Sequence, residues 1–291
     1  MRRAAGVLLA ALSAASLAAG QHPVFSGTAA LEFTRKAVAF GPRPSGSAAI
    51  RKLQAYIHAE LKPLHCEVID DNFRASTPFG PIPMQNIIAR FRGASGRVVA
   101  VTGHYDTKVM PGINFVGAND GGSSTGFLLE MARALSHTPH KDDIWLVWFD
   151  GEEAFVRFSE TDGTYGSRRL ASQWLSDGTL AKLKALINVD MIGDRDLGLL
   201  NEQESTEWLR RLVWDSASKL GLSKHFLTEP NSILDDHIPF LKAGASALDL
   251  IDFDYGPNNS YWHTAQDTMD KLSAQSLAIV GRVLLAVIGQ L

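Results

Sequence analysis

The stretch RVVAVTGHYD, residues 97–106, is an apolar run that ends in a histidine and an aspartate. A second stretch, IWLVWFDGEE at residues 144–153, has the same design and ends in acidic residues. Short, nearly continuous apolar runs are typical of strands that are buried on both faces of a sheet. Both stretches therefore predict buried strands that carry polar, reactive side chains at their carboxyl ends.

Segments with strand and helix character alternate along most of the chain. Two further strands are predicted at residues 186–192 (LINVDMI) and 247–251 (ALDLI), and residues 67–73 and 86–91 are predicted to pair as antiparallel edge strands. The spacing of apolar residues predicts helices at residues 123–135, 165–175, 204–220 and 272–288. Apolar strands that alternate with helices indicate an α/β fold, here a single domain with a mostly parallel central sheet flanked by helices on both faces.

The composition is that of a globular protein with a substantial core. The 291 residues are 45% hydrophobic and 20% charged, and the formal net charge is −3. No basic block stands out, so we expect no nucleic-acid partner. Cys66 is the single cysteine, which excludes a disulfide within the chain and a thiolate metal cluster.

Residues 1–20 are typical of a secretory signal peptide. An arginine pair precedes an Ala-rich apolar run, and small residues lie just before Gln21. We expect cleavage there, which would leave a catalytic domain at residues 21–291 in a secreted or periplasmic protein. A retained membrane anchor is the less favoured alternative, because the run is short for a span of roughly 20 apolar residues. No other stretch is suited to spanning a bilayer.

Acidic residues and histidines recur at the ends of the predicted strands and in a Gly-rich turn before a predicted helix. They are His104, Asp120, Glu152, Glu153, Asp190 and His263. These positions gather at one edge of a parallel sheet, where several like charges are costly without a cation. Nitrogen and carboxylate oxygen ligands suit zinc, with other divalent ions possible. One of two adjacent glutamates can bind the metal while the other acts as a base, which suits metal-assisted acyl chemistry.

The same residues lie in motifs that resemble those of the glutaminyl cyclases, or glutaminyl-peptide cyclotransferases, of the zinc exopeptidase superfamily. The motifs are GHYDTK (103–108), FVGAND (115–120), FDGEEAF (149–155), YGSRRLA (165–171), DDHIPFL (235–241) and WHT (262–264). The resemblance runs from about residue 30 to the last residue. It implies a zinc aminopeptidase-like fold and an acyltransferase that converts an N-terminal glutamine of peptides or proteins to pyroglutamate and releases ammonia.

The resemblance also implies a metal site and a proton carrier. One zinc ion per chain would be bound by Asp120, Glu153 and His263. Glu152 would be the general acid/base. His104 and Asp190 occupy the positions that hold a second metal in the two-zinc aminopeptidases of the superfamily.

Further roles follow from the same resemblance. Asp190 and Asp235 would form a carboxylate network that positions the reacting groups, and Trp262 and Phe158 would line the substrate pocket. Phe158 falls where the animal cyclases have a tryptophan. Asp249 falls where they have a histidine, so we expect the hydrogen-bond network there to differ.

Two other functions remain open at this point. A zinc-dependent aminopeptidase of the same superfamily is the main alternative, because His104 and Asp190 are both retained. A binding protein on an inactive peptidase fold is a weaker alternative, because it predicts the loss of Glu152 or of a metal ligand, and neither is lost. In the favoured interpretation the partners are peptides or proteins with N-terminal glutamine.

Overall fold

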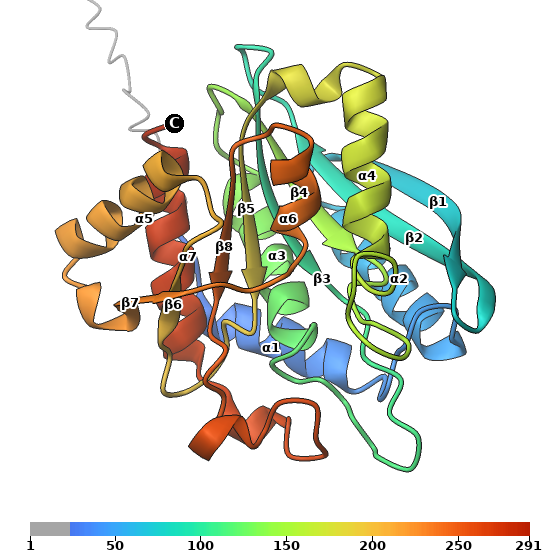
Figure 1. Cartoon of the computed structure of the whole chain (residues 1–291). Coiled ribbons are helices and arrows are strands. Elements are labelled where there is room, and N and C mark those ends of the chain that lie inside the picture. Colours follow the sequence, from blue (N-terminus) through green and yellow to red (C-terminus); the bar gives the residue numbers. More distant parts are fainter. Residues whose placement is uncertain (1–23) are drawn as a thin grey trace, which may run out of the picture.

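A six-stranded sheet in the order β1-β2-β4-β3-β5-β8 forms the centre of the molecule. It is seen in a computed structural model that describes residues 24–291, so the predicted signal peptide lies outside the described residues (Figure 1). The strands are β1 (Glu67–Thr77), β2 (Gly80–Phe91), β3 (Val98–His104), β4 (Asp143–Phe149), β5 (Leu183–Asp190) and β8 (Ala247–Ile251).

The pairing of the strands is mostly parallel. β3 lies parallel to both β4 and β5, and β5 lies parallel to β8. β1 and β2 form an antiparallel hairpin, and β2 joins the sheet antiparallel to β4. This arrangement confirms the predicted fold class and the predicted antiparallel pair at one edge.

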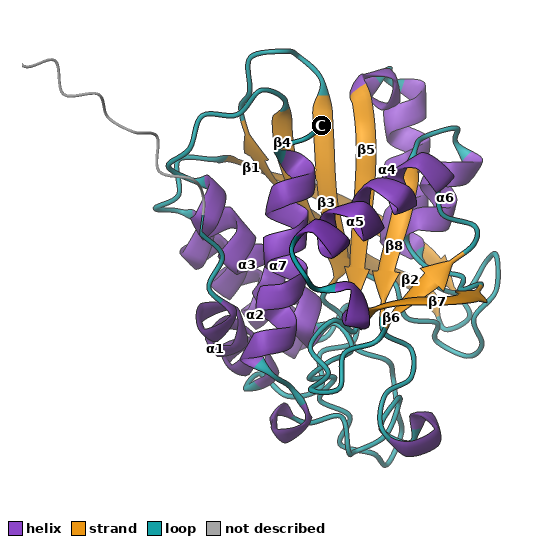
Figure 2. Cartoon of the chain, turned by 90° about the vertical axis from the view of Figure 1, so that its left-hand side faces the viewer, coloured by secondary structure: helices purple, strands orange, loops and turns teal. Residues whose placement is uncertain are grey.

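Helices cover both faces of this sheet (Figures 1 and 2). One face packs against α1 (Gly27–Val38), α2 (Ala48–Leu61), α3 (Gly122–Leu135), α5 (Glu207–Lys219) and α7 (Ala274–Ile288). The other face packs against α4 (Tyr165–Ser176) and α6 (His237–Lys242). Two short parallel strands, β6 (Leu199–Glu202) and β7 (Phe226–Asn231), form a separate sheet. Short 3-10 turns lie at Thr179–Lys182, Ser223–His225, Pro257–Asn259 and Met269–Lys271.

The core consists of two apolar layers, one on each side of the sheet. On the side of α4, the Trp174 ring lies 5.1 Å from that of Trp145 and 5.5 Å from that of Phe240. On the other side, Phe127 and Leu128 of α3 are fully buried. Complete burial of one such side chain contributes about 1.5–3 kcal/mol, so the sheet is anchored firmly on both faces.

Several element boundaries differ from those predicted. The strand predicted at residues 186–192 ends at Asp190, because Met191 adopts a left-handed conformation with φ of 50°. Asp190 therefore lies at the carboxyl end of β5, whereas the sequence placed it inside an apolar run. The helix predicted from residue 204 begins at Glu207, because the carboxylate of Glu202 accepts the N–H groups of residues 204 and 205 and holds them in a turn.

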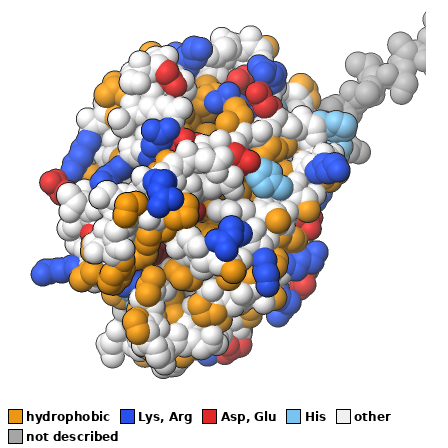
Figure 3. Space-filling model, turned by 90° about the vertical axis from the view of Figure 1, so that its right-hand side faces the viewer, with side chains coloured by type: hydrophobic (Ala, Val, Ile, Leu, Met, Phe, Trp, Pro, Cys, Tyr) orange, Lys and Arg blue, Asp and Glu red, His pale blue; other side chains and the backbone are white. Residues whose placement is uncertain are grey.

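The parallel strands end together at one edge of the sheet, and the loops that follow them gather below their arrowheads in Figure 2. This is the edge where ligands bind in open α/β sheets. On the face shown in Figure 3, Lys and Arg side chains are spread singly among apolar and acidic ones, without a basic patch. Within residues 24–291, no helix has the length and apolar character that crossing a membrane requires.

Candidate metal centre and active-site pocket

A pocket of about 510 Å³ opens at this edge, and we call it the active-site pocket. Its polar lining comes from the strand ends and the loops beyond them, namely Lys108, Asp120, Glu152, Glu153, Arg157, Asp190, Ser232, Asp235 and His263. Its apolar lining is Val156, Phe158, Ile233, Leu234, Ile251, Phe253 and Trp262. Every residue predicted for the site lines this pocket except His104, which is buried beside Asp120 and Asp190.

The first ligand set is formed by Asp120, Glu153 and His263, whose candidate ligand atoms all lie within 4.8 Å of one another. The Nε2 atom of His263 lies 3.2 Å from Asp120 Oδ2 and 3.1 Å from Glu153 Oε1. All three residues line the active-site pocket. Two carboxylates and an imidazole that face a cavity are the donors of a three-ligand catalytic zinc site.

The second ligand set is formed by His104, Asp120 and Asp190. The Nε2 atom of His104 lies 3.1 Å from Asp120 Oδ1 and 3.1 Å from Asp190 Oδ1. Asp120 belongs to both sets, as a carboxylate that bridges two ions would. The donors of a two-metal site are therefore all in place.

The electrostatics of the site fit a bound cation. Burial raises the pKa of Asp190 to about 7, and burial together with the neighbouring Glu153 and Asp235 raises the pKa of Glu152 well above its usual range. Although burial lowers the pKa of His263, its hydrogen bonds to Asp120 and Glu153 raise that pKa to about 9. These shifts have one physical cause, the concentration of buried negative charge, which a divalent cation would offset.

The turn that carries Asp120 is fixed by a second buried carboxylate. Asp267 accepts the backbone N–H of Asn119 at 2.7 Å and that of Asp120 at 3.1 Å, and it also accepts the Tyr255 hydroxyl at 2.8 Å. Gly121, which follows Asp120, has φ of 73°. A Cβ there would lie 2.4 Å from the Asp106 carbonyl oxygen, so only glycine fits between Asp120 and the start of α3.

The adjacent glutamates after β4 occupy different positions in the site. Asp106 accepts the backbone N–H of Glu152 at 3.1 Å and that of Glu153 at 3.4 Å, which fixes the chain between them. Glu153 belongs to the first ligand set, and its Oε2 lies 3.4 Å from Lys108 Nζ. Glu152 lines the same pocket but belongs to neither ligand set. One carboxylate is therefore placed to hold a metal, and its neighbour is left free to face a substrate.

Aromatic rings enclose His263. Trp262 stacks on the imidazole with ring centres 4.0 Å apart, and Phe115 meets it edge-on at 5.6 Å. Phe253 in turn packs edge-on against Trp262 at 4.9 Å. His263 also adopts φ of 51°, an uncommon conformation for a non-glycine residue that persists where the surrounding structure imposes it. The ring is thus held in one orientation toward the first ligand set.

Behind Asp235 lies a buried polar network that the sequence did not predict in full. The side-chain amide of Asn188 donates to Asp235 and to Asp249, each at 3.0 Å. Asp249 is fully buried, and burial raises its pKa well above the usual range. Nearby, His237 Nε2 lies 3.3 Å from Glu202 Oε2. Asp190 contacts His104 and has no hydrogen bond to Asp235 among the described residues, whereas Asn188 links Asp235 to Asp249.

A mostly parallel sheet with clustered carboxylates and imidazoles at its carboxyl edge is the arrangement of an α/β enzyme of the exopeptidase type. Residues 86–288 match peptidase family M28. The glutaminyl-peptide cyclotransferase of Drosophila melanogaster is 31% identical over 271 residues, which cover 83% of this chain and 76% of that protein. The chain belongs to peptidase family M28 and, within it, to the glutaminyl-peptide cyclotransferases.

Solved structures agree with this placement. The crystal structure of an Acidobacteriales bacterium glutaminyl cyclase matches with a TM-score of 0.90 and 42% identity, and covers 96% of this chain and 98% of that one. A Zn-dependent exopeptidase from Parabacteroides distasonis matches with a TM-score of 0.82 and 26% identity, over 92% of this chain and 99% of that one. The family and fold predicted from the motifs are thereby confirmed, while the roles of individual site residues stay predictions.

Proposed function

We propose that this enzyme is a zinc-dependent glutaminyl-peptide cyclotransferase, an acyltransferase that acts on peptides and proteins with N-terminal glutamine. The observation that carries the proposal is that Glu152 lines the pocket beside Asp120, Glu153 and His263 without belonging to that candidate ligand set. The cyclase motifs and the names of the similar proteins support cyclisation over peptide hydrolysis.

The reaction joins two groups of the same residue. The α-amine nitrogen forms a bond to the carbon of the side-chain carboxamide, the bond from that carbon to its own nitrogen breaks, and ammonia leaves. Glu152 would accept the proton that the attacking amine loses and deliver it to the departing nitrogen. Zinc held by Asp120, Glu153 and His263 would supply Lewis acidity to the carboxamide oxygen. Water is not consumed.

The walls of the pocket suit ring closure. Trp262, Phe158 and Phe253 supply apolar surface on which the glutamine side chain can fold back toward its own amine. Holding two reacting groups together in this way replaces much of the entropy loss of a bimolecular step. The same walls exclude water, which would otherwise compete as a nucleophile. Asp235 lines the pocket and accepts a hydrogen bond from Asn188, so it would be available to accept one from the substrate amine.

We expect one zinc ion per chain. His104 Nε2 lies 3.1 Å from Asp190 Oδ1. In this pair a protonated imidazole would balance the negative charge of the carboxylate without a second ion. The complete second ligand set is also the specific observation that favours the other candidate, a two-zinc aminopeptidase.

Two matched substitutions and metal analysis test the assigned roles. Glu152→Gln keeps the shape of the side chain and removes its capacity to carry a proton, so we expect full zinc content and a loss of activity of roughly 100-fold or more. Glu153→Gln replaces a ligand, so we expect weaker zinc binding in metal titrations of the chelator-treated protein. Release of zinc by Glu152→Gln would reverse the two assignments, and two tightly bound ions per chain would favour the aminopeptidase.

A further inference from the structure

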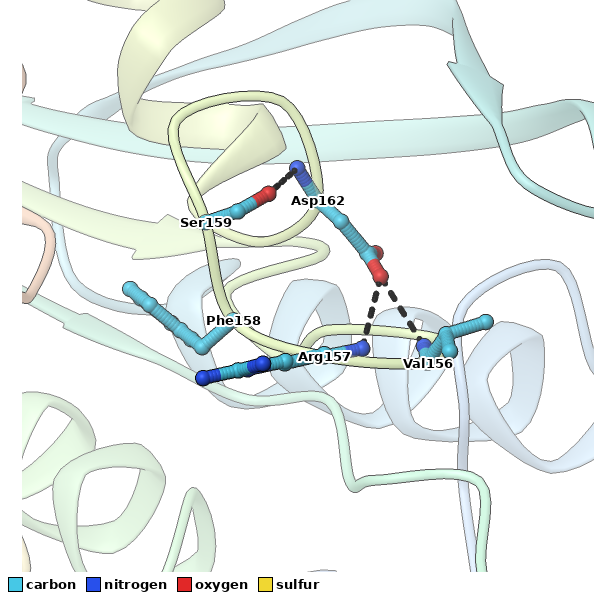
Figure 4. Close-up of a pocket in the computed structure, with 5 residues that line it drawn as sticks. All are labelled: Val156, Arg157, Phe158, Ser159 and Asp162. Atoms are coloured by element: carbon cyan, nitrogen blue, oxygen red, sulfur yellow. Dashed lines mark hydrogen bonds between the residues drawn. The ribbon is translucent and has the colours of Figure 1, made fainter.

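The segment that follows Glu153, residues 154–163, forms one side of the pocket opening, and we call it the mouth loop. The carboxylate of Asp162 accepts the backbone N–H groups of Phe155, Val156 and Arg157 at 2.8, 2.9 and 3.0 Å. It also accepts the Tyr165 hydroxyl at 2.9 Å. Figure 4 shows Asp162 turned toward this backbone. The carboxylate therefore holds residues 155–157 against the other end of the mouth loop, which sets the direction of the side chains that they carry.

Arg157 extends from this fixed backbone on the same side of the loop as Phe158, while Val156 points away from both (Figure 4). Arg157 lines the active-site pocket together with Glu152 and Asp235, and it also lines the hollow drawn in Figure 4. The Arg157 side chain is exposed. It is thus a cation at the boundary between the active-site pocket and solvent.

The other cations around the opening already have partners. Lys108 Nζ lies 2.9 Å from the Ala154 carbonyl oxygen and 3.4 Å from Glu153. Lys242 pairs with Glu160 at 3.0 Å, and Arg168 donates to the Gly163 carbonyl oxygen at 3.0 Å. The guanidinium of Arg157, by contrast, has neither a hydrogen bond nor a carboxylate within 4 Å in residues 24–291.

The proposed reaction fixes where a substrate chain must leave the pocket. The N-terminal glutamine has to lie beside Glu152 and the first ligand set, so the residues that follow it run outward past the pocket lining that includes Arg157. We propose that Arg157 is a specificity-determining residue that favours substrates with an acidic side chain in the two residues after the glutamine. This inference rests on the proposed cyclotransferase function.

The expected effect is modest, because an exposed ion pair is screened by water and salt. Attraction of this kind corresponds to about a twofold to fivefold change in kcat/KM at low ionic strength. A basic side chain at the same substrate position should lower kcat/KM by a similar factor. Both effects should shrink at about 0.5 M salt, where the Debye length falls well below 10 Å.

Four amidated tripeptides test the proposal on the zinc-loaded full-length enzyme: Gln-Ala-Ala, Gln-Glu-Ala, Gln-Ala-Glu and Gln-Lys-Ala. The amides remove the terminal carboxylate, so that the side chains alone carry the charge. We expect an acidic peptide to be cyclised fastest and the lysyl peptide slowest. Arg157→Gln should level the four rates, and Arg157→Glu should invert their order.

Arg92→Gln is the matched control, because it removes one exposed positive charge from the opposite edge of the sheet. Arg92 follows β2, which ends beside Ile144 at the start of β4, and its guanidinium lies 2.8 Å from Glu67. This variant should keep the wild-type order of rates. Equal rates on all four peptides in the wild type, or an unchanged order in Arg157→Glu, would overturn the inference and leave the cyclase function intact. Failure of the wild type to cyclise Gln-Ala-Ala-amide would instead overturn the proposed function.

Discussion

Replacing Asp162 by alanine should loosen the mouth loop and weaken substrate binding. The Asp162 carboxylate accepts four hydrogen bonds, two on each oxygen: Phe155 N–H and the Tyr165 hydroxyl on Oδ1, Val156 and Arg157 N–H on Oδ2. Val156 and Arg157 are exposed, so water can replace the carboxylate there. The donors of Phe155 and Tyr165 are more deeply placed. Loss of the charged acceptor should lower the free energy of unfolding by about 1.5 kcal/mol for each of these two hydrogen bonds.

Asp162→Ala should therefore lower the free energy of unfolding by about 3 kcal/mol, or roughly 5–10 °C in Tm. Asp162→Asn keeps an oxygen that can serve the two deeper donors, so its cost should be nearer 1 kcal/mol. Because the mouth loop carries Phe158, KM for a glutaminyl peptide should rise in the same order. Zinc content should not change, since Asp162 lies in neither ligand set.

Denaturant unfolding and steady-state cyclisation kinetics measure both quantities. Asp177→Asn is the control, because Asp177 is exposed and accepts the Thr179 N–H at 2.9 Å, far from the pocket lining. This variant should leave KM unchanged and lower the free energy of unfolding by less than about 1 kcal/mol. If Asp162→Ala retained wild-type stability and KM, the carboxylate would not be what fixes the mouth loop, and the argument from that loop would fail.

Three further predictions concern other parts of the chain. Although burial raises the pKa of Glu202, its close contact with His237 and the hydrogen bonds that it accepts from Ser205 lower that pKa to about 2. The carboxylate therefore contributes stability above its ordinary pKa of about 4.3 and loses it as the pH falls toward 2. Glu202→Gln should therefore lower the free energy of unfolding by about 2–3 kcal/mol at pH 7 and by less at lower pH. Denaturant unfolding at several pH values would contradict this if the difference between wild type and variant did not change with pH. Trp262→Ala removes the ring stacked on His263 and should raise KM about twofold to tenfold while zinc stays bound, whereas unchanged kinetics would exclude Trp262 from the substrate wall. Mass spectrometry of the exported protein should find an N-terminus at Gln21, and an intact Met1 would contradict cleavage of the signal peptide.

The central strands and their reactive ends could be predicted because their signals are local. β3 and β4 are buried along nearly their whole length, so their apolar runs stand out in the sequence; His104 is the last residue of β3, and Glu152 lies three residues after the end of β4. The helices predicted at residues 123–135 and 165–175 agree closely with α3 and α4. By contrast, β7 is exposed at every residue but its first and shows no apolar alternation, which is why it was missed.

The residues that support the site could not be found in the same way, because their partners are distant in the sequence. Asp267 stabilises Asp120 across 147 positions of the chain. Arg43 is fully buried and donates to the carbonyl oxygens of Tyr105, Val116 and Gly117, which ties together the two ends of the loop between β3 and α3. Only the folded chain shows that such residues meet.

Some unrecognised residues did have a signal. Asn188 is a polar residue inside an apolar strand, and burial of an amide requires partners, which it finds in Thr102, Asp235 and Asp249. His237 lies within the DDHIPFL motif, but its contact with Glu202 depends on how α6 packs beside β6. A buried polar residue within a motif is thus a useful indicator of a supporting role, although it does not identify the partner.

The most direct test of the central claim is the product formed from one N-terminal glutaminyl peptide by the zinc-loaded enzyme. Mass spectrometry with an ammonia assay should find a pyroglutamyl peptide of full length and one ammonia for each peptide converted, while a leucyl amide remains largely intact under the same conditions. Release of free glutamine with a shortened peptide, or hydrolysis of the leucyl amide faster than cyclisation, would contradict the account and identify an aminopeptidase.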